Sequence, residues 1–420
     1  MDSIFILRVT FVSIFLAVFS IKLLLDFLNI RFMRKHSGTI PAGFEAEVDS
    51  DRLKEMQEYT SEQTRLGLVK FLCEIALLFS ILFGGPLHFF ISTAYKFSHP
   101  VTQGLVFFLM LGGVYWFFSI PFDLLKNFRL EQRFGFNRQT FSLWVIDLTK
   151  STFLTILLGG MVLIAVLSLI YKTGPFWWLY SWGTVFVFGI IFTILYPVLI
   201  APIFNKFFPV ENSSLREKIE QVVKECGIHP TGIFKMDAGR RSTHSNAYFT
   251  GLGRNKRIVL FDTLVEKLDE NAITTVVAHE AGHWKRKHLL KGFIISEVYS
   301  FLWFLIAGLL LRSPTFYRIF FINSQPFWAG LLLLGIIWIP VNFLLSPFFA
   351  AYSRKNECEA DDMVIELTDD SESFKRALVT LSKDNLANLN PHPLYVRFYY
   401  SHLPPPQRVD RILSIEKSQR

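Results

Sequence analysis

The chain has 420 residues, of which 51% are hydrophobic, only 19% are charged and 45 are phenylalanine. Soluble proteins carry about 25% charged residues, so this composition excludes a solvated multidomain protein and indicates a protein of the lipid bilayer. The net charge is +8. In a membrane protein, basic cytoplasmic loops explain such a surplus, and we therefore infer no nucleic-acid partner.

Seven stretches with few charges are long enough to cross a hydrocarbon core of about 30 Å, which takes about 20 helical residues. They lie at residues 4–30, 75–95, 97–122, 151–171, 173–205, 292–311 and 327–352. A cleaved signal peptide is the alternative for the first stretch, but it has no A-x-A-like site and is too long. We therefore expect an all-α polytopic membrane protein.

These crossings divide the chain into four parts. They are residues 1–205, with five membrane helices and the loops 31–67 and 123–150; a polar domain at 206–290; 291–353, with the last two membrane helices; and a C-terminal segment at 354–420. With seven crossings, both loops, the polar domain and the C-terminal segment fall on one side, which carries most of the basic residues. The positive-inside rule makes this side cytoplasmic and places the N-terminus on the opposite face.

The polar domain contains the sequence HEAGHW at 279–284. Acidic residues at its start and the lack of proline predict a helix over 270–290. On a helix, His279 and His283 lie one turn apart on one face, so both can bind one metal ion, and Glu280 can act as general base on metal-bound water. The alternative is a chance pentapeptide on an amphipathic helix, on the order of one in a hundred for this length.

A catalytic zinc site needs a third protein ligand and an open position. If the segment after the last span is helical, Glu357 and Asp361 share a face, whereas Glu359 points elsewhere. Glu357 can then bind the metal, and Asp361 can hold a ligand histidine by its second nitrogen. On spacing alone, a solvated acidic patch at the end of a membrane helix remains an equal alternative. Because both halves of the site adjoin membrane spans, we expect the metal at the cytoplasmic interface.

Glu297 follows His279 by 18 residues, which is five turns of an α-helix. If the helix continues unbroken, Glu297 faces the same way as the metal, roughly 27 Å further along the axis. An ionisable group at this depth usually faces a protein interior or a hydrated cavity, so we expect Glu297 to line an internal chamber. A structural ion pair with a neighbouring helix is the alternative.

Upstream of this helix, residues 246–250 and 257–261 are expected to form two short strands around a turn at 251–255. We therefore expect a metalloprotease-type domain that is helical apart from a small β-hairpin. An exposed edge of the hairpin can bind an extended peptide by strand addition. A purely structural hairpin is equally compatible with the sequence.

Several of these segments together resemble the CAAX prenyl protease 1 family of integral-membrane zinc metallopeptidases. The resemblance covers most of the chain, and HExGHW followed by ExxAD is much more specific than HExxH alone. The other matching segments are FGFN (134–137) with Thr140, Asp147 and Lys150, PIFNK (202–206), RSTHSNAYF (241–249), RIVLFDT (257–263), NPHPL (390–394) and Ser401 with His402.

The resemblance implies seven helices around a large water-filled chamber, with a zincin-like site at its cytoplasmic end. It assigns one Zn²⁺ to His279, His283 and Glu357, catalysis to Glu280, and a supporting role behind the ligands to Asp361.

The resemblance also implies contacts to the substrate. It places the substrate strand along Asn246, Ala247, Tyr248 and Phe249. His402 and Arg408 match a tail motif whose histidine approaches the reaction centre, where it can stabilise an oxyanion, and we expect Arg408 to contact the substrate. Leu403 stands where the family usually has proline, and without the resemblance His402 would be read as an ordinary surface histidine before a proline run.

We therefore expect a zinc metalloendopeptidase that cleaves peptide bonds near the C-terminus of CAAX-type proteins, which in this family are usually prenylated. It would lie in the endoplasmic reticulum membrane of a eukaryote or the inner membrane of a bacterium. A membrane quality-control protease without a prenyl requirement is one alternative, and a zinc-stabilised transporter or channel is another. Glu280 argues against the last, because a structural zinc site is closed by four ligands and needs no free base.

Overall fold

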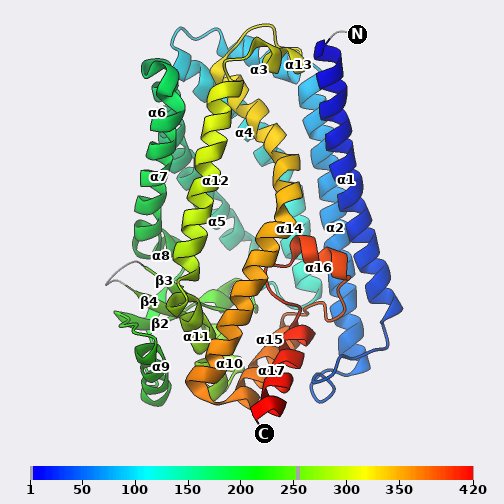
Figure 1. The fold of residues 1–420 in the computed structure, drawn as a ribbon, viewed down its shortest axis with the longest axis vertical. Helices are drawn as coiled ribbons and strands as arrows, with labels where there is room; N and C mark the ends of the chain where they lie inside the picture. The colour runs from blue at the N-terminus through cyan, green and yellow to red at the C-terminus, as the bar shows by residue number, and fades with distance from the viewer. Residues whose placement is uncertain (1–2, 252–255, 420) are drawn as a thin grey trace.

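The computed structural model describes residues 3–251 and 256–419, and within these ranges seven helices are long and apolar enough to cross a membrane. They are Ser3–Lys35 (α1), Ser50–Phe83 (α2), Pro100–Glu131, Phe141–Lys172, Gly174–Phe204, His288–Leu310 (α12) and Phe327–Thr368 (α14). The long helices run side by side along the vertical axis of Figure 1. A mostly helical, multi-pass membrane protein with seven membrane helices is thereby confirmed.

Three of the seven are composite helices. The first is α4 (Pro100–Leu125) with η1 (Lys126–Glu131); the second is α5 (Phe141–Leu154), η2 (Thr155–Gly159) and α6 (Gly160–Lys172); the third is η3 (Gly174–Phe176), α7 (Trp177–Leu195), η4 (Tyr196–Ile200) and α8 (Ala201–Phe204). The π-helical segments η1, η2 and η4 change the hydrogen-bond spacing without ending the helix, so each composite remains one continuous helix.

The predicted position of the second span, 75–95, is wrong. Helix α2 ends at Phe83, where the amide of Gly84 bonds to the carbonyl of Ser80 and Gly85 takes a left-handed conformation with φ of 101°. Pro86 then begins a separate short helix, α3 (Pro86–Ala94). Glycine tolerates positive φ and proline favours the first turn of a helix, so these three residues divide one apolar stretch into two helices.

The helices also extend well beyond the apolar stretches. Helix α2 begins at Ser50, inside the segment 31–67 that we expected to be a loop, and α14 continues 16 residues past residue 352 to Thr368. Hydropathy detects only the part of a helix that crosses lipid, whereas the backbone hydrogen bonds continue into the polar region. As a result, Glu357 lies on the last membrane helix itself.

The polar segment between the fifth and sixth spans folds around a four-stranded sheet with strand order β1-β2-β4-β3. Its elements are β1 (Phe207–Pro209), α9 (Ser213–Glu225), β2 (Gly232–Met236), η5 (Ala238–Arg240), β3 (Ala247–Thr250), β4 (Arg257–Phe261), α10 (Asp262–Lys267) and α11 (Glu270–Lys285). The antiparallel pairing of β3 with β4 confirms the predicted strands. Residues 252–255 of the predicted turn lie outside the described residues. Strands β1 and β2 were not predicted, because β2 pairs in parallel with β4, whose partner residues lie about 25 positions further along the chain.

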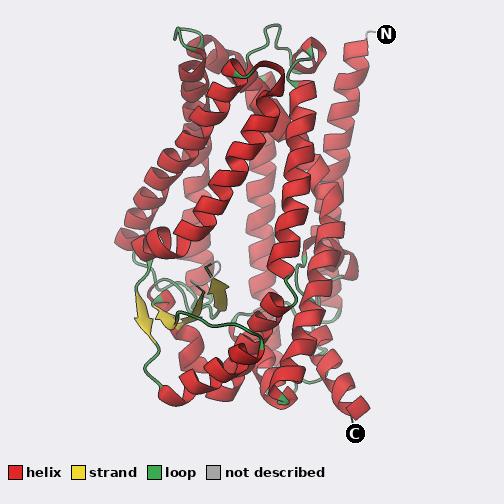
Figure 2. Ribbon diagram, turned by 60° about the vertical axis from the view of Figure 1, so that its left-hand side comes forward, coloured by secondary structure: helices red, strands yellow, loops and turns green. Residues whose placement is uncertain are grey.

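All of these polar elements lie at one end of the long helices. The sheet, α9, α10 and α11 gather there with α15 (Ser371–Asp384), α17 (Pro405–Gln419) and the C-terminus, whereas the N-terminus lies at the opposite end (Figures 1 and 2). Two short helices, α3 and α13 (Pro314–Ile319), lie near the N-terminal end. Helix α16 (Pro393–Tyr399) packs against α14 and α1, because the chain crosses back after α15.

A continuous apolar core joins the metal-site helix to the sheet. Val277 and Ala281 of α11 pack with Ala247 of β3 and with Leu260 of β4. Residues four positions apart, on one face of α11, therefore pack on the sheet, and another face meets α14.

Candidate metal centre

Helix α11 carries the two histidines of the HEAGHW motif. Its first turn is capped by Asp269, whose carboxylate accepts a hydrogen bond from the amide of Ala272. One turn apart, His279 and His283 point the same way, and their Nε2 atoms lie 3.2 Å from each other. The predicted helix is thus confirmed, except that it ends at Lys285 rather than at residue 290.

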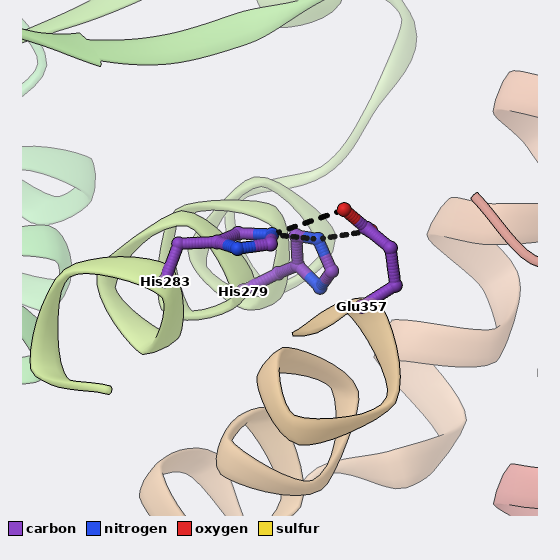
Figure 3. A group of neighbouring side chains, drawn as sticks. All are labelled: His279, His283 and Glu357. Atoms are coloured by element: carbon purple, nitrogen blue, oxygen red, sulfur yellow. Dashed lines mark hydrogen bonds and ion pairs between the residues drawn. The ribbon is translucent and has the colours of Figure 1, made fainter. Parts of the chain in front are cut away.

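Glu357 of α14 completes the group (Figure 3). Its Oε2 lies 3.2 Å from Nε2 of His279, and its Oε1 lies 3.4 Å from Nε2 of His283. One potential ligand atom from each of the three residues lies within 4.8 Å of the others. The side chain of Glu357 is only 6% exposed and points towards the two histidines, so the alternative of a solvated acidic patch is wrong for Glu357.

Close contact between two helix backbones brings Glu357 to the histidines. A Cβ added at Gly282 would lie 3.2 Å from both Cα and the carbonyl oxygen of Ala360 and 3.0 Å from Cβ of Met363. Glycine at this position therefore lets α11 approach the backbone of α14. Since Ala360 follows Glu357 by three residues, this contact sets the distance between the halves of the site.

Asp361 and Arg408 lie behind His279. Nδ1 of His279 lies 2.8 Å from Asp361, whose two oxygens accept hydrogen bonds of 2.9 Å and 2.6 Å from the guanidinium of Arg408. Burial alone would lower the pKa of His279, but its hydrogen bonds with the carboxylates of Asp361 and Glu357 outweigh this and raise its pKa to about 9. Asp361 thus takes the position that the sequence predicted for it. The geometry favours a supporting role for Arg408 over the expected contact with substrate.

His283 has a second partner that sequence reasoning missed. Its Nδ1 lies 3.0 Å from Nδ1 of His288, and Nε2 of His288 lies 3.1 Å from Oε2 of Glu359. The i,i+4 spacing predicted that Glu357 and Asp361 share the helical face at the metal and that Glu359 lies on another face. The available signal was a third histidine five residues after His283.

Glu280 and His402 border the group of ligands. Burial raises the pKa of Glu280, and the nearby charges of His279 and His283 oppose that rise without cancelling it. Nδ1 of His402 lies 2.8 Å from Oε2 of Glu357, although 62% of the His402 side chain is exposed. The tail segment therefore reaches the site even though Leu403 follows His402.

The predicted substrate strand occupies the edge of the sheet next to α11. Its side chains alternate: Ala247 and Phe249 face the core shared with α11, whereas Tyr248 faces the opposite side, against Met236 and Phe261. Burial raises the pKa of Tyr248 to about 12. Within the described ranges β3 pairs with β4 alone, so its other edge offers backbone groups beside the metal centre. Asn246, at the start of the strand, is exposed.

The loop that leads into β3 is tied to a membrane helix. Arg241 makes a bidentate pair with Asp147 of α5, with contacts of 2.8 Å and 3.1 Å, and also donates to the carbonyl of Phe204. Thr140 caps the start of α5 at the amide of Leu143. These motif residues therefore fix the entry to the edge strand rather than contact the metal group.

Contrary to the prediction, Glu297 does not share a continuous helix with the metal ligands. Lys287 has a φ of 59°, and α12 begins at the next residue, so α11 and α12 are separate helices rather than the unbroken one that the alignment required. Glu297 is half-buried, and among the described residues it makes no ion pair that would support the structural alternative. Its role as a lining residue stays a prediction.

Two protein-family models together cover nearly the whole chain. Residues 29–206 match the model described as CAAX prenyl protease N-terminal, five membrane helices. Residues 209–417 match that of peptidase family M48. The boundary between the two falls at the start of the polar segment, close to the division at residue 205 that we expected.

Known proteins match over similar lengths. A CAAX prenyl protease 1 homolog of Arabidopsis thaliana is 34% identical, with 90% of each chain covered. CAAX prenyl protease 1 of Saccharomyces cerevisiae is 31% identical, with 93% of this chain and 92% of that protein covered. The crystal structure of S. mikatae Ste24p matches with a TM-score of 0.89 and 29% identity, over 96% of this chain and 98% of that one. With the paired histidines and the buried glutamate, these similarities show that the chain belongs to the CAAX prenyl protease 1 family of M48 membrane metalloproteases.

Proposed function

We propose that this protein is a zinc endopeptidase that cleaves peptide bonds near the C-terminus of CAAX-type proteins, with prenylated chains as its preferred substrates. The relatives are named CAAX prenyl proteases and resemble this chain over most of its length. Membership in a peptidase family also argues against the transporter alternative.

The observation that carries this proposal is the arrangement of the imidazole nitrogens. Nδ1 of His279 is engaged by Asp361 and Nδ1 of His283 by His288, so each Nε2 is directed at the other and at Glu357. Oε2 of Glu357 is buried, and among the described residues its contacts with Nε2 of His279 at 3.2 Å and Nδ1 of His402 at 2.8 Å do not have hydrogen-bond geometry. Two imidazole nitrogens and one carboxylate that converge in this way fit a catalytic Zn²⁺, which takes three protein ligands and keeps one position open.

Glu280 is the group that moves the proton. A bound Zn²⁺ supplies Lewis-acid chemistry, since it makes a water nucleophilic at neutral pH and polarises the scissile carbonyl. The carboxylate of Glu280 accepts a proton from the attacking water and passes it to the leaving amine. Burial raises the pKa of this carboxyl, which makes the carboxylate a stronger base towards the attacking water. A catalytic pKa nearer to the working pH suits a group that must both take up and give up a proton in one cycle.

The edge of β3 holds the substrate in this proposal. An extended peptide that pairs with Ala247–Thr250 gains backbone hydrogen bonds and lies along α11, beside Glu280. Asn246, at the exposed end of the strand, is placed to contact the same peptide. His402 holds its Nδ1 against a carboxylate oxygen of Glu357, and the structure describes no other hydrogen bond for its ring. Nε2 can donate to an oxyanion when the ring carries a proton on each nitrogen.

Two features support a chamber between the helices. A helix in a solid bundle buries a stripe at least about 100° wide, or roughly a third of its residues. Here the apolar windows of Ser50–Phe83 and Pro100–Glu131 are only 6% buried. A polar cavity of about 570 Å³ also lies between these two helices and the tail, and Tyr59, Glu131 and Tyr400 are among its lining residues. Exposure of both faces fits helices that contact lipid outside and solvent inside.

Glu280→Gln tests the catalytic assignment. We expect cleavage to fall by at least about 10²–10⁴-fold while zinc stays bound, because the amide keeps the shape of the side chain and loses the base. Purified full-length protein is incubated with farnesylated and unprenylated CAAX peptides of one sequence, with and without a chelator, and bound zinc is measured in parallel.

Each result has a distinct meaning. Faster cleavage of the farnesylated peptide supports the proposed substrate, and equal cleavage of both peptides supports a quality-control protease. Wild-type rates in Glu280→Gln, or in fully chelated protein, would overturn the mechanism.

A further inference from the structure

We propose that His288, held by Glu359, is a positioning residue that fixes the ring of His283 for metal binding. This inference rests on the proposed zinc site, because it concerns how one of its ligands is held. Neither residue belongs to the three ligands or contacts the proposed substrate strand.

Three helices supply the residues of this hydrogen-bonded series. His283 is near the end of α11, His288 is the first residue of α12, and Glu359 lies on α14. His288 is only 5% exposed, and its two ring nitrogens lie 3.0 Å from Nδ1 of His283 and 3.1 Å from Oε2 of Glu359. Both nitrogens of this buried ring are therefore used.

The proton positions along the series His283, His288 and Glu359 follow from the chemistry of imidazole. To bind a metal through Nε2, neutral His283 must carry its proton on Nδ1, from which it donates to Nδ1 of His288. That nitrogen must then be an acceptor, so neutral His288 carries its proton on Nε2 and donates to the carboxylate of Glu359. Every contact has one donor and one acceptor. The reverse arrangement would place the proton of His283 on Nε2 and block the ligand atom.

The backbone between the helices brings His288 back to His283. In an unbroken helix, a residue five positions later is rotated by roughly 140° and lies on another face. Here α11 ends at Lys285, and Lys287 adopts a φ of 59°, which is unfavourable for a residue with a Cβ. Unfavourable backbone conformations are common at functional sites, where the surrounding contacts enforce them. The contact between His283 and His288 depends on this break.

The two histidine ligands thus have separate supports of different chemistry. Nδ1 of His279 meets the carboxylate of Asp361 directly, whereas Nδ1 of His283 reaches the carboxylate of Glu359 through an intervening imidazole. Residues that orient a ligand in this way typically contribute 10–100-fold to metal affinity.

Zinc affinity of the full-length protein, measured by competition with a chelator, tests this proposal. We expect His288→Ala to weaken zinc binding by about 10–100-fold and Glu359→Ala to weaken it by a smaller factor. His288→Gln is expected to recover part of the loss, because its amide oxygen can accept the proton of His283. His229→Ala is the matched control, since His229 is an exposed histidine of the same polar region.

The variants separate positioning from simple packing. The melting temperature of each metal-free protein is measured beside its affinity. Wild-type affinity in both His288→Ala and Glu359→Ala would overturn the proposal, as would equal losses in His288→Ala and His288→Gln that follow a lower metal-free melting temperature. If His288→Ala does not fold, Glu359→Ala decides, because its side chain is 31% exposed. Failure of wild-type protein to bind zinc, or wild-type affinity in His283→Ala, would instead refute the metal site itself.

Discussion

His279 has a carboxylate at each of its ring nitrogens, with Asp361 at Nδ1 and Glu357 at Nε2. Without a metal, this arrangement favours a charged imidazolium, and the pKa of about 9 reflects it. With a metal, the proton on Nε2 must leave, while Asp361 keeps the proton on Nδ1 and so maintains the tautomer that binds. The same carboxylates therefore stabilise either a proton or a cation at this position.

This competition predicts how zinc binding depends on pH. Because the pKa of His279 is raised, the metal-free site holds a proton below about pH 9, and zinc must displace it. We expect the apparent zinc affinity to rise by about tenfold per pH unit between pH 7 and pH 9 and to level off above that range. Chelator competition in buffers across this range measures it.

Asp361→Asn serves as the comparison for this titration. Among the influences on the pKa of His279, the hydrogen bond with Asp361 is second only to burial and is the largest of those that raise the pKa. Its loss should therefore make the increase of zinc affinity above pH 7 shallower in the variant. An unchanged slope would show that another group releases the proton.

At the scale of elements, the contact between α11 and α14 decides whether a metal group exists at all. One helix contributes both histidines and the other contributes the glutamate, and the two meet at Gly282 and Ala360. Their separation is set by backbone atoms, which cannot move aside as the end of a flexible side chain can.

Gly282→Ala is expected to separate these helices and weaken zinc binding. Alanine gains up to about 1 kcal/mol in helix propensity, whereas overpacking typically costs about 1–3 kcal/mol, so the net effect on stability is small and unfavourable. The loss of zinc affinity should be the clearer effect, because the ligands lie on opposite sides of the contact. Thermal unfolding and chelator competition measure the two effects.

Gly292→Ala provides the control for this substitution. Gly292 lies on α12, and among the described residues an added Cβ would meet no atom within 4 Å beyond the adjoining backbone of its own helix, so we expect unchanged zinc affinity and equal or slightly higher stability. Equal zinc affinities in the two variants would refute the role assigned to the close contact.

For the whole molecule, an odd number of membrane helices separates the two ends of the chain. The N-terminus and the metal centre lie at opposite ends of the long helices (Figure 1). Basic residues are concentrated around the polar end, so the positive-inside rule predicts that this end is cytoplasmic.

Tags at the two termini test this orientation. In sealed membrane vesicles with the cytoplasmic face outside, we expect protease to remove a C-terminal tag and to leave an N-terminal tag intact until detergent is added. Removal of both tags from sealed vesicles would contradict seven crossings, and removal of the N-terminal tag alone would reverse the orientation.

The sequence by itself determined the features that depend on local order. The apolar stretches indicated seven membrane helices, and the i,i+4 spacing of His279 and His283 indicated two ligands on one helical face, because both patterns repeat within a few residues. For Glu357, a role as metal ligand remained one of two interpretations, since helical spacing shows which face a residue occupies but not what that face meets.

Only the tertiary structure decided the remaining contacts. The break at Lys287 separated Glu297 from the metal and turned His288 towards His283, and a close backbone contact brought Glu357 to both histidines. These outcomes depend on a single left-handed residue and on packing between helices about 80 residues apart. Neither leaves a periodic pattern in the sequence, because each results from contacts that form only when distant segments pack together.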